Sequence, residues 1–219
     1  MLNTKNADNV KHNKQFWDFV AKKHKSILNE EGSKLGEIES VLLEYGIRSE
    51  DEINQVCSRL SQADKDKLCK HLLHFLSFGL HANERMLIFE VLTLAKYCDV
   101  VEILLTEFWR KECEDRWGIG DLLYNTACKQ YYEQYVAIAK DSEFGVDRQM
   151  VVLIFGKLKL ATAKSLLISL LNDPTVYGHA LDSLSKICSK NDLPIFLRFT
   201  DCECTWIKKI AINFVKKHS

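Results

Sequence analysis

Five side chains in the C-terminal half of the sequence have the types that build a binding surface. Trp117 and Asp121 are four residues apart, so both project from the same face if this segment is helical. Arg148, Tyr177 and Lys208 follow at intervals close to thirty residues. Rigid aromatic rings supply contact area, and a guanidinium supplies directional hydrogen bonds. Side by side, these residues would form one strip of aromatic and charged groups.

The same residues also allow a structural interpretation. Trp117 would then pack between neighbouring helices while Asp121 and Arg148 pair as a ladder, an arrangement that is common and of modest value. His179 in the segment YGHAL lies on the face that meets the strip, although a lone histidine is more often structural than a general base. The structural ladder stays open beside our prediction that the strip binds a partner. The predicted partner-binding residues are Trp117, Asp121, Arg148, Tyr177, His179 and Lys208.

Other clusters give weaker signals for chemistry. His71 and His74 lie one helical turn apart with Cys69 and His81 nearby, but none of the recognised zinc spacings is present. The sequence has no phosphate-binding G-x-x-x-x-G-K-[ST] loop, no dinucleotide-binding G-x-G-x-x-G and no defensible Ser/His/Asp arrangement. We therefore expect no metal, no cofactor and no catalytic residue.

The strip residues belong to segments that repeat. WGIGDLLY, RQMVVLIF, YGHALDSL and KKIAINFV align without gaps, and their first residues are 31, 29 and 31 positions apart. A repeat at this period is typical of a solenoid, in which each unit buries its apolar face only against its neighbours. We predict four pairs of helices at about 100–112 with 115–128, 131–140 with 146–158, 161–171 with 175–187, and 193–199 with 205–217.

The N-terminal half is predicted to be helical but less regular. Ser49 with Glu52 resembles a capping box, and Ser61 with Asp64 forms a weaker one. Only 2 Pro and 9 Gly in 219 residues, without a hairpin signal, favour helices over strands. The prediction is an all-α fold, a right-handed α-solenoid of antiparallel helix pairs. We expect a flexible tail over 1–12, helices over 13–30, 35–45, 49–60 and 82–97, another that starts near 61, and one domain over 13–219 with regular repeats over 98–219.

Composition narrows the class of protein. The formal net charge is +0, whereas a nucleic-acid-binding protein usually has an excess of basic residues. The polar opening MLNTKNADNVKHNKQ lacks the features of a secretory signal, and no stretch approaches the roughly 18 apolar residues of a membrane span. The 8 cysteines are scattered without a C-x-x-C pair, so we expect reduced thiols. We predict a cytoplasmic monomer that does not bind a membrane.

The aligned segments resemble HEAT repeats over about residues 98–218. The segments LLISLLNDPTVYGHALDSLSKI and TWIKKIAINFVKK match best, and the column of small residues contains Gly120, Val151, Ala180 and Ala211. HEAT-family proteins are mainly scaffolds whose second helices line the concave side. The resemblance implies a non-enzymatic interaction module, an adaptor, regulator or immunity-like inhibitor, that binds a protein partner on that side.

Three residues also resemble part of the HEAT-like alkylpurine DNA glycosylases. That family uses a Trp and an Asp one turn apart and an Arg from the next repeat, and Trp117, Asp121 and Arg148 match in kind and order. The resemblance implies an alternative in which DNA is the partner and Asp121 is catalytic. The carboxylate would stabilise positive charge on the deoxyribose as an alkylated base departs. A third class, the HEAT-type lyases that act on a tetrapyrrole, has no supporting residue.

Overall fold

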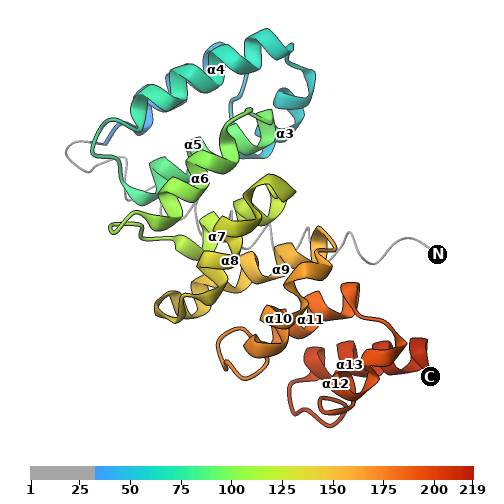
Figure 1. Cartoon of the computed structure of the whole chain (residues 1–219). Coiled ribbons are helices and arrows are strands. Elements are labelled where there is room, and N and C mark those ends of the chain that lie inside the picture. The colour runs from blue at the N-terminus through green and yellow to red at the C-terminus, as the bar shows by residue number, and fades with distance from the viewer. Residues whose placement is uncertain (1–32) are drawn as a thin grey trace. The chain divides into compact units, whose positions relative to one another are not determined.

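The computed structural model describes residues 33–219, and the predicted tail over 1–12 and helix over 13–30 lie outside that range. Throughout the described range the chain is helical and contains no strand, which confirms the all-α prediction there (Figure 1). The described residues divide between two compact units, and the boundary lies between Val100 and Val101. This division lies close to residue 98, where the regular repeats are predicted to begin.

The described part of the first unit contains four helices. Helix α2 packs against α4, while α5 packs against both α3 and α4. Their apolar faces meet in a core that includes Ile38, Leu68, Leu72, Ile88 and Leu92, each fully buried. The four helices are α2 (Leu35–Glu44), α3 (Glu50–Arg59), α4 (Gln62–Phe75) and α5 (Ala82–Ala95).

Only one of the two predicted capping boxes in this unit forms through its hydroxyl group. Ser61 Oγ accepts a hydrogen bond from the backbone N–H of Asp64 at 3.2 Å and caps α4. Ser49 precedes α3 without such a bond, and Glu52 instead accepts the N–H of Arg48 at 3.0 Å. The Glu52 carboxylate therefore binds the N–H of Arg48, one residue before the Ser49 N–H that a capping box would use.

The second unit contains helices close to the positions predicted for the four pairs. Short 3-10 turns η1 (Lys129–Tyr131), η2 (Ser142–Arg148), η3 (Ala161–Ala163) and η4 (Lys190–Asp192) lead into several of the helices. Pro174 lies in the turn before its helix, which begins at Tyr177 and not at residue 175. The helices are α6 (Val100–Trp109), α7 (Arg116–Thr126), α8 (Tyr132–Lys140), α9 (Gln149–Lys157), α10 (Lys164–Leu170), α11 (Tyr177–Ile187), α12 (Leu193–Leu197) and α13 (Thr205–His218).

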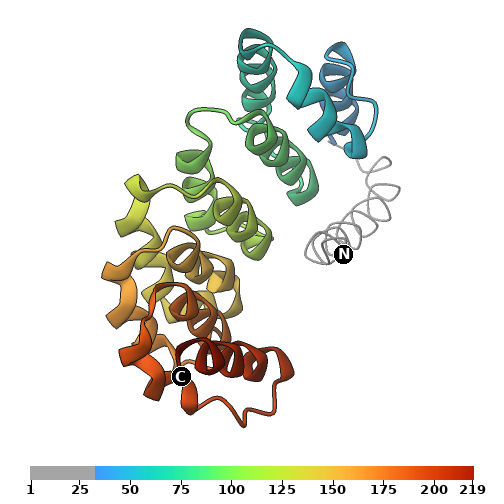
Figure 2. The ribbon, with the colours of Figure 1, turned by 90° about the vertical axis from the view of Figure 1, so that its right-hand side faces the viewer.

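The second helices of the pairs pack on one another in chain order. Helix α7 contacts α9, α9 contacts α11, and α11 contacts α13, while α8, α10 and α12 each pack on the second helix of their own pair. Figure 2 shows the same order in the colours from yellow to red within this unit. Equivalent positions of α7, α9, α11 and α13 are therefore carried by neighbouring helices.

Small residues allow the close approach of α9 and α11. A Cβ on Gly156 would lie 2.6 Å from the Cα of Ser183, so any larger residue would separate the helices. Ser183 is buried, and its hydroxyl donates to the carbonyl oxygen of Val152 at 2.8 Å. A buried hydroxyl with a partner avoids the penalty for an unsatisfied polar group, so this bond fixes the register between the two helices.

Candidate interaction surface

Trp117 and Asp121 lie on the side of α7 that remains open. Asp115 begins the helix by accepting the N–H of Gly118 at 2.8 Å, which places Trp117 in the first turn. The Trp117 side chain is 38% exposed, and its indole Nε1 donates to Oε1 of Gln149 at 3.4 Å. One turn later Asp121 is half-buried and accepts a hydrogen bond from Asn125 at 3.3 Å. The pair is thus oriented by neighbours on α7 and α9.

Arg148 is not presented on this face. Its side chain is buried, with 1% exposure, and its guanidinium donates to the carbonyl oxygens of Ala139 at 2.8 Å and Gly145 at 3.1 Å. It also pairs with the Asp173 carboxylate and donates to Thr175 Oγ1 at 3.1 Å. Arg148 therefore connects the turn before α9 to the turn before α11. A ladder does exist, but its carboxylate comes from Asp173 and not from Asp121.

Asp173 organises the second of these turns. It accepts hydrogen bonds from the backbone N–H of Thr175 at 2.9 Å and from the Thr175 hydroxyl at 2.6 Å. Burial opposes ionisation of this carboxyl group, but the bonds from Thr175 and Arg148 outweigh it and lower its pKa. The carboxylate is therefore ionised at neutral pH, as its pairing with the buried guanidinium requires.

Lys157 at the end of α9 connects to the end of α7. Its ammonium donates to the backbone carbonyls of Tyr124 and Asn125, the latter at 3.1 Å, and lies 4.5 Å from the centre of the Tyr124 ring. These carbonyls belong to the last turn of α7, where no intrahelical donor remains. Desolvation lowers the pKa of Lys157, although the nearby Asp121 opposes that shift. The Lys157 ammonium and the Asp121 carboxylate are thus close enough to interact electrostatically.

His179 contacts Trp206, which is not among the predicted partner-binding residues. The imidazole and the Trp206 indole meet edge to face, with ring centres 5.5 Å apart. Trp206 lies against Gly178, where a Cβ would be 2.4 Å from the indole Cη2, yet it remains 45% exposed. Desolvation lowers the pKa of His179, which keeps the ring neutral at pH 7. The missing side chain of Gly178 therefore gives the indole a fixed seat across α11 and α13.

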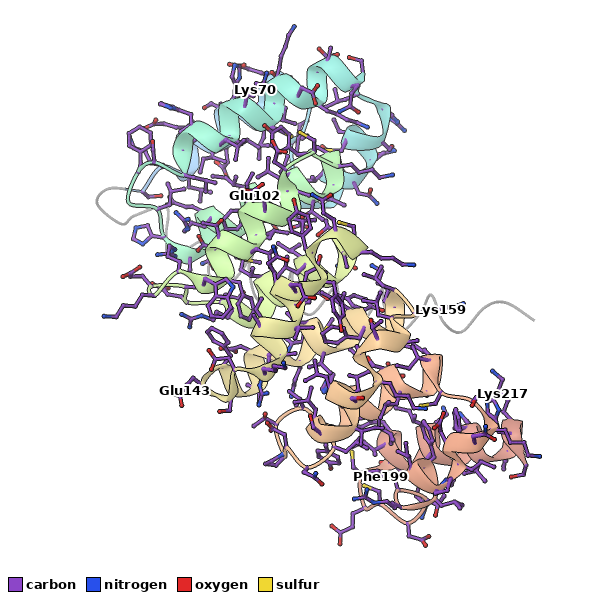
Figure 3. The ribbon with its side chains drawn as sticks, in the orientation of Figure 1. Lys70, Glu102, Glu143, Lys159, Phe199 and Lys217 are labelled. Carbon is purple, nitrogen blue, oxygen red and sulfur yellow. The ribbon has the colours of Figure 1, made fainter. Side chains whose placement is uncertain are left out.

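Tyr177 and Lys208 have their contacts with residues that follow α12. The Tyr177 ring stacks on Phe199 with 6.4 Å between centres, and burial raises the pKa of its hydroxyl group. Lys208 is half-buried, and its ammonium lies 4.0 Å from the Asp201 carboxylate. Both side chains thus contact the segment that connects α12 to α13, a part of which is seen around the labelled Phe199 in Figure 3.

The predicted strip therefore separates into parts. Trp117 and Asp121 lie with Gln149 and Lys157 on α7 and α9, and His179 lies with Trp206 on α11 and α13. Arg148 lies in the interior, and Tyr177 and Lys208 lie at a connecting segment. Trp206 stands two residues before Lys208 in the segment TWIKKI, but this position does not indicate that its indole is exposed.

Within residues 33–219 no three His, Cys, Asp or Glu side chains come together as a metal-binding set. The cysteines of this range are free thiols, and Cys57, Cys69 and Cys113 are buried. Burial raises the pKa of Cys69 to about 12, so its thiol is protonated and unreactive at neutral pH. No helix in the described range has the length and apolar character needed to cross a bilayer.

Comparison with known proteins adds no relative. No family model, curated protein or solved structure matches this chain. Its function has to be argued from its own residues.

Proposed function

We propose that residues 101–219 form a right-handed HEAT-type solenoid whose second-helix face binds a protein partner without catalysing a reaction. We define the second-helix face as the open side of α7, α9, α11 and α13. Its role would be that of an adaptor, a regulator or an immunity-like inhibitor. We further propose that the protein is a cytoplasmic monomer, consistent with its free, partly buried thiols.

The observation that carries this proposal is the pair of exposed indoles, each of which contacts side chains of a neighbouring second helix. Trp117 and Trp206 stand in the first turns of α7 and α13, exposed by 38% and 45%. Gln149 orients one, and Gly178 with His179 seats the other. A tryptophan that is already ordered loses little side-chain entropy on binding, and Trp is enriched among residues that dominate interface energies.

The open positions between the tryptophans suit recognition of a protein. Helix α9 exposes part of Leu153, and α11 exposes part of Asp182, so the face carries an apolar and a charged group. Such a mixture is typical of the surfaces that non-obligate partners share.

A photo-crosslinking experiment tests this proposal. We would place p-benzoylphenylalanine at Leu153 on the second-helix face or at Ile168, which is 38% exposed on the first helix α10. In cells that naturally contain the protein, Leu153 should yield a defined crosslinked protein and Ile168 should not. Trp117→Ala and Trp206→Ala should each reduce the yield while far-ultraviolet circular dichroism is unchanged. Equal yields from both positions would contradict the proposal.

The DNA glycosylase alternative receives less support. It needs Trp117, Asp121 and Arg148 on one open surface, whereas the Arg148 guanidinium is buried and hydrogen-bonded on several sides. We therefore do not put it forward. Release of alkylated bases from duplex DNA by the purified protein, abolished by Asp121→Asn, would reinstate it.

A further inference from the structure

Three lysines occupy equivalent positions on the second-helix face. Lys157, Lys186 and Lys217 are separated by 29 and 31 residues, the same intervals that relate the repeats. They stand in the last turns of α9, α11 and α13, helices that pack on one another in that order. Figure 3 labels Lys217 near the end of the chain. The three side chains, which we call the lysine row, are all exposed.

Two lysines of the row contact the preceding second helix. The Lys157 ammonium reaches the carbonyls at the end of α7. The stem of Lys186 crosses Gly156 of α9, whose added Cβ would lie 3.1 Å from the Lys186 Cδ. Its ammonium pairs with Asp182 at 2.7 Å. Each ammonium has three N–H donors, so Lys157 and Lys186 keep donors for a partner while these bonds persist.

The charge of this part of the chain is strongly positive. Residues 148–219 contain eleven Lys and Arg against five Asp and Glu, a formal net charge of +6. Residues 101–147 contain five against ten, a net charge of −5, so the overall neutrality conceals an asymmetry. An anionic partner would therefore be drawn toward α9, α11 and α13.

The spacing of the row indicates which anionic partner fits. Packed helices lie about 8–10 Å apart, so successive lysines of the row stand about one such step from each other. A polyproline II helix rises about 3.1 Å per residue with three residues per turn, so every third side chain recurs on one face after about 9.3 Å. Carboxylates at every third residue of such a segment would meet the lysines one by one.

The remaining features of the face agree with that partner. Asp121 and Asp182 add negative charge beside the row, which would repel the continuous phosphates of a nucleic acid. A peptide with neutral residues between its carboxylates avoids that repulsion.

We propose that the lysine row binds an extended acidic segment of a partner protein, in the polyproline II conformation, with a carboxylate at every third residue. This inference rests on the proposed function and specifies its ligand. It makes the register of the charges, and not their number, the basis of recognition.

Peptides of identical composition test the register. The probe is fluorescein-labelled (Glu-Pro-Pro)4, whose 12 residues span about 37 Å as polyproline II. Its control carries four consecutive glutamates followed by eight prolines. Fluorescence anisotropy with the full-length protein at 50 mM salt should show the spaced peptide binding about tenfold more tightly, and raising the salt should weaken binding. Equal affinities for the two peptides would overturn the proposal.

Charge variants locate the site. Lys157→Gln, Lys186→Gln and Lys217→Gln together should weaken the spaced peptide about tenfold or more. The matched control changes three exposed lysines outside the row, Lys111, Lys129 and Lys140, to Gln and should bind almost as the parent does. Equal losses of affinity in both triple variants would show that net charge alone governs binding, and would overturn the proposal that the lysine row is the site. Circular dichroism would verify that both variants remain folded.

Two further outcomes separate this inference from the proposed function. Tighter binding of a single-stranded or duplex oligonucleotide than of the spaced peptide would overturn the choice of a protein ligand. If no peptide binds while Leu153 still crosslinks a partner, the acidic segment is refuted and the interaction function stands. If neither occurs, both are refuted.

Discussion

Replacement of Arg148 by methionine tests whether the buried guanidinium holds the repeats together. The change keeps an unbranched side chain of similar reach but removes every donor. It leaves the Asp173 carboxylate without its cation and the carbonyls of Ala139 and Gly145 without their donor. Thr175 still donates to the carboxylate. The loss therefore combines an unpaired charge with unsatisfied carbonyls.

The magnitude follows from burial. Breaking a buried ion pair by removing one partner costs about 3–5 kcal/mol. The Asp173 side chain is 22% exposed, so water can solvate part of its charge, and we expect the lower end, about 3 kcal/mol. For a chain of this size that corresponds to a fall of about 6–12 °C in Tm.

Urea unfolding followed by circular dichroism measures this difference. Arg198→Met is the matched control, because Arg198 is exposed and near the Phe199 ring, and it should change stability by about 0.5 kcal/mol or less. Asp173→Asn, alone and with Arg148→Met, completes a double-mutant cycle whose coupling should reach about 1–3 kcal/mol. A loss below about 1 kcal/mol for Arg148→Met would refute the reasoning, because the guanidinium would then not hold the turns together.

Two further predictions concern close packing, and a third concerns the titration of a buried histidine. Gly178→Ala should destabilise by about 1–3 kcal/mol in urea unfolding, because the Cβ meets the indole, and Trp206→Ala in the same chain should recover part of that loss. Gly156→Ala should also destabilise the protein, because its Cβ would meet Ser183. Gly36→Ala on α2, where the Cβ would enter open space, should instead stabilise it by about 0.4–1 kcal/mol. A change in stability of the same sign for both variants would contradict the packing argument. Burial lowers the pKa of His179, so on acidification the unfolded chain binds a proton at a higher pH than the folded chain does. The free energy of unfolding should therefore fall as the pH drops through about 6.5. His179→Gln should reduce this pH dependence in melts recorded at several pH values.

The sequence predicted the helices of the second unit well because their apolar periodicity and the thirty-residue repeat are local signals. Most predicted helices differ from the observed ones by a few residues at each end, as between residues 146–158 and Gln149–Lys157. The differences arise where 3-10 turns such as η2 precede the α-helix. Helix ends depend on capping bonds whose choice of partner the residue pattern leaves open, as Ser49 shows.

The binding face was harder to predict because alignment gives a position but not the direction of a side chain. Arg148 shares a column with Trp117, yet it ends a 3-10 turn and points toward Ala139 and Asp173. Trp206 was missed because its exposure depends on Gly178, which belongs to a different repeat. Arg148 pairs with Asp173, 25 residues away, and Trp206 lies on Gly178, 28 residues away, so neither outcome can be read from a local pattern.

The central claim is that equivalent positions of successive second helices stand side by side. Pulsed electron paramagnetic resonance between spin labels at Lys157 and Lys217 measures this directly, because two packing steps separate them. The account predicts one narrow distribution centred at about 20 Å. A broad distribution, or a centre beyond about 30 Å, would contradict it.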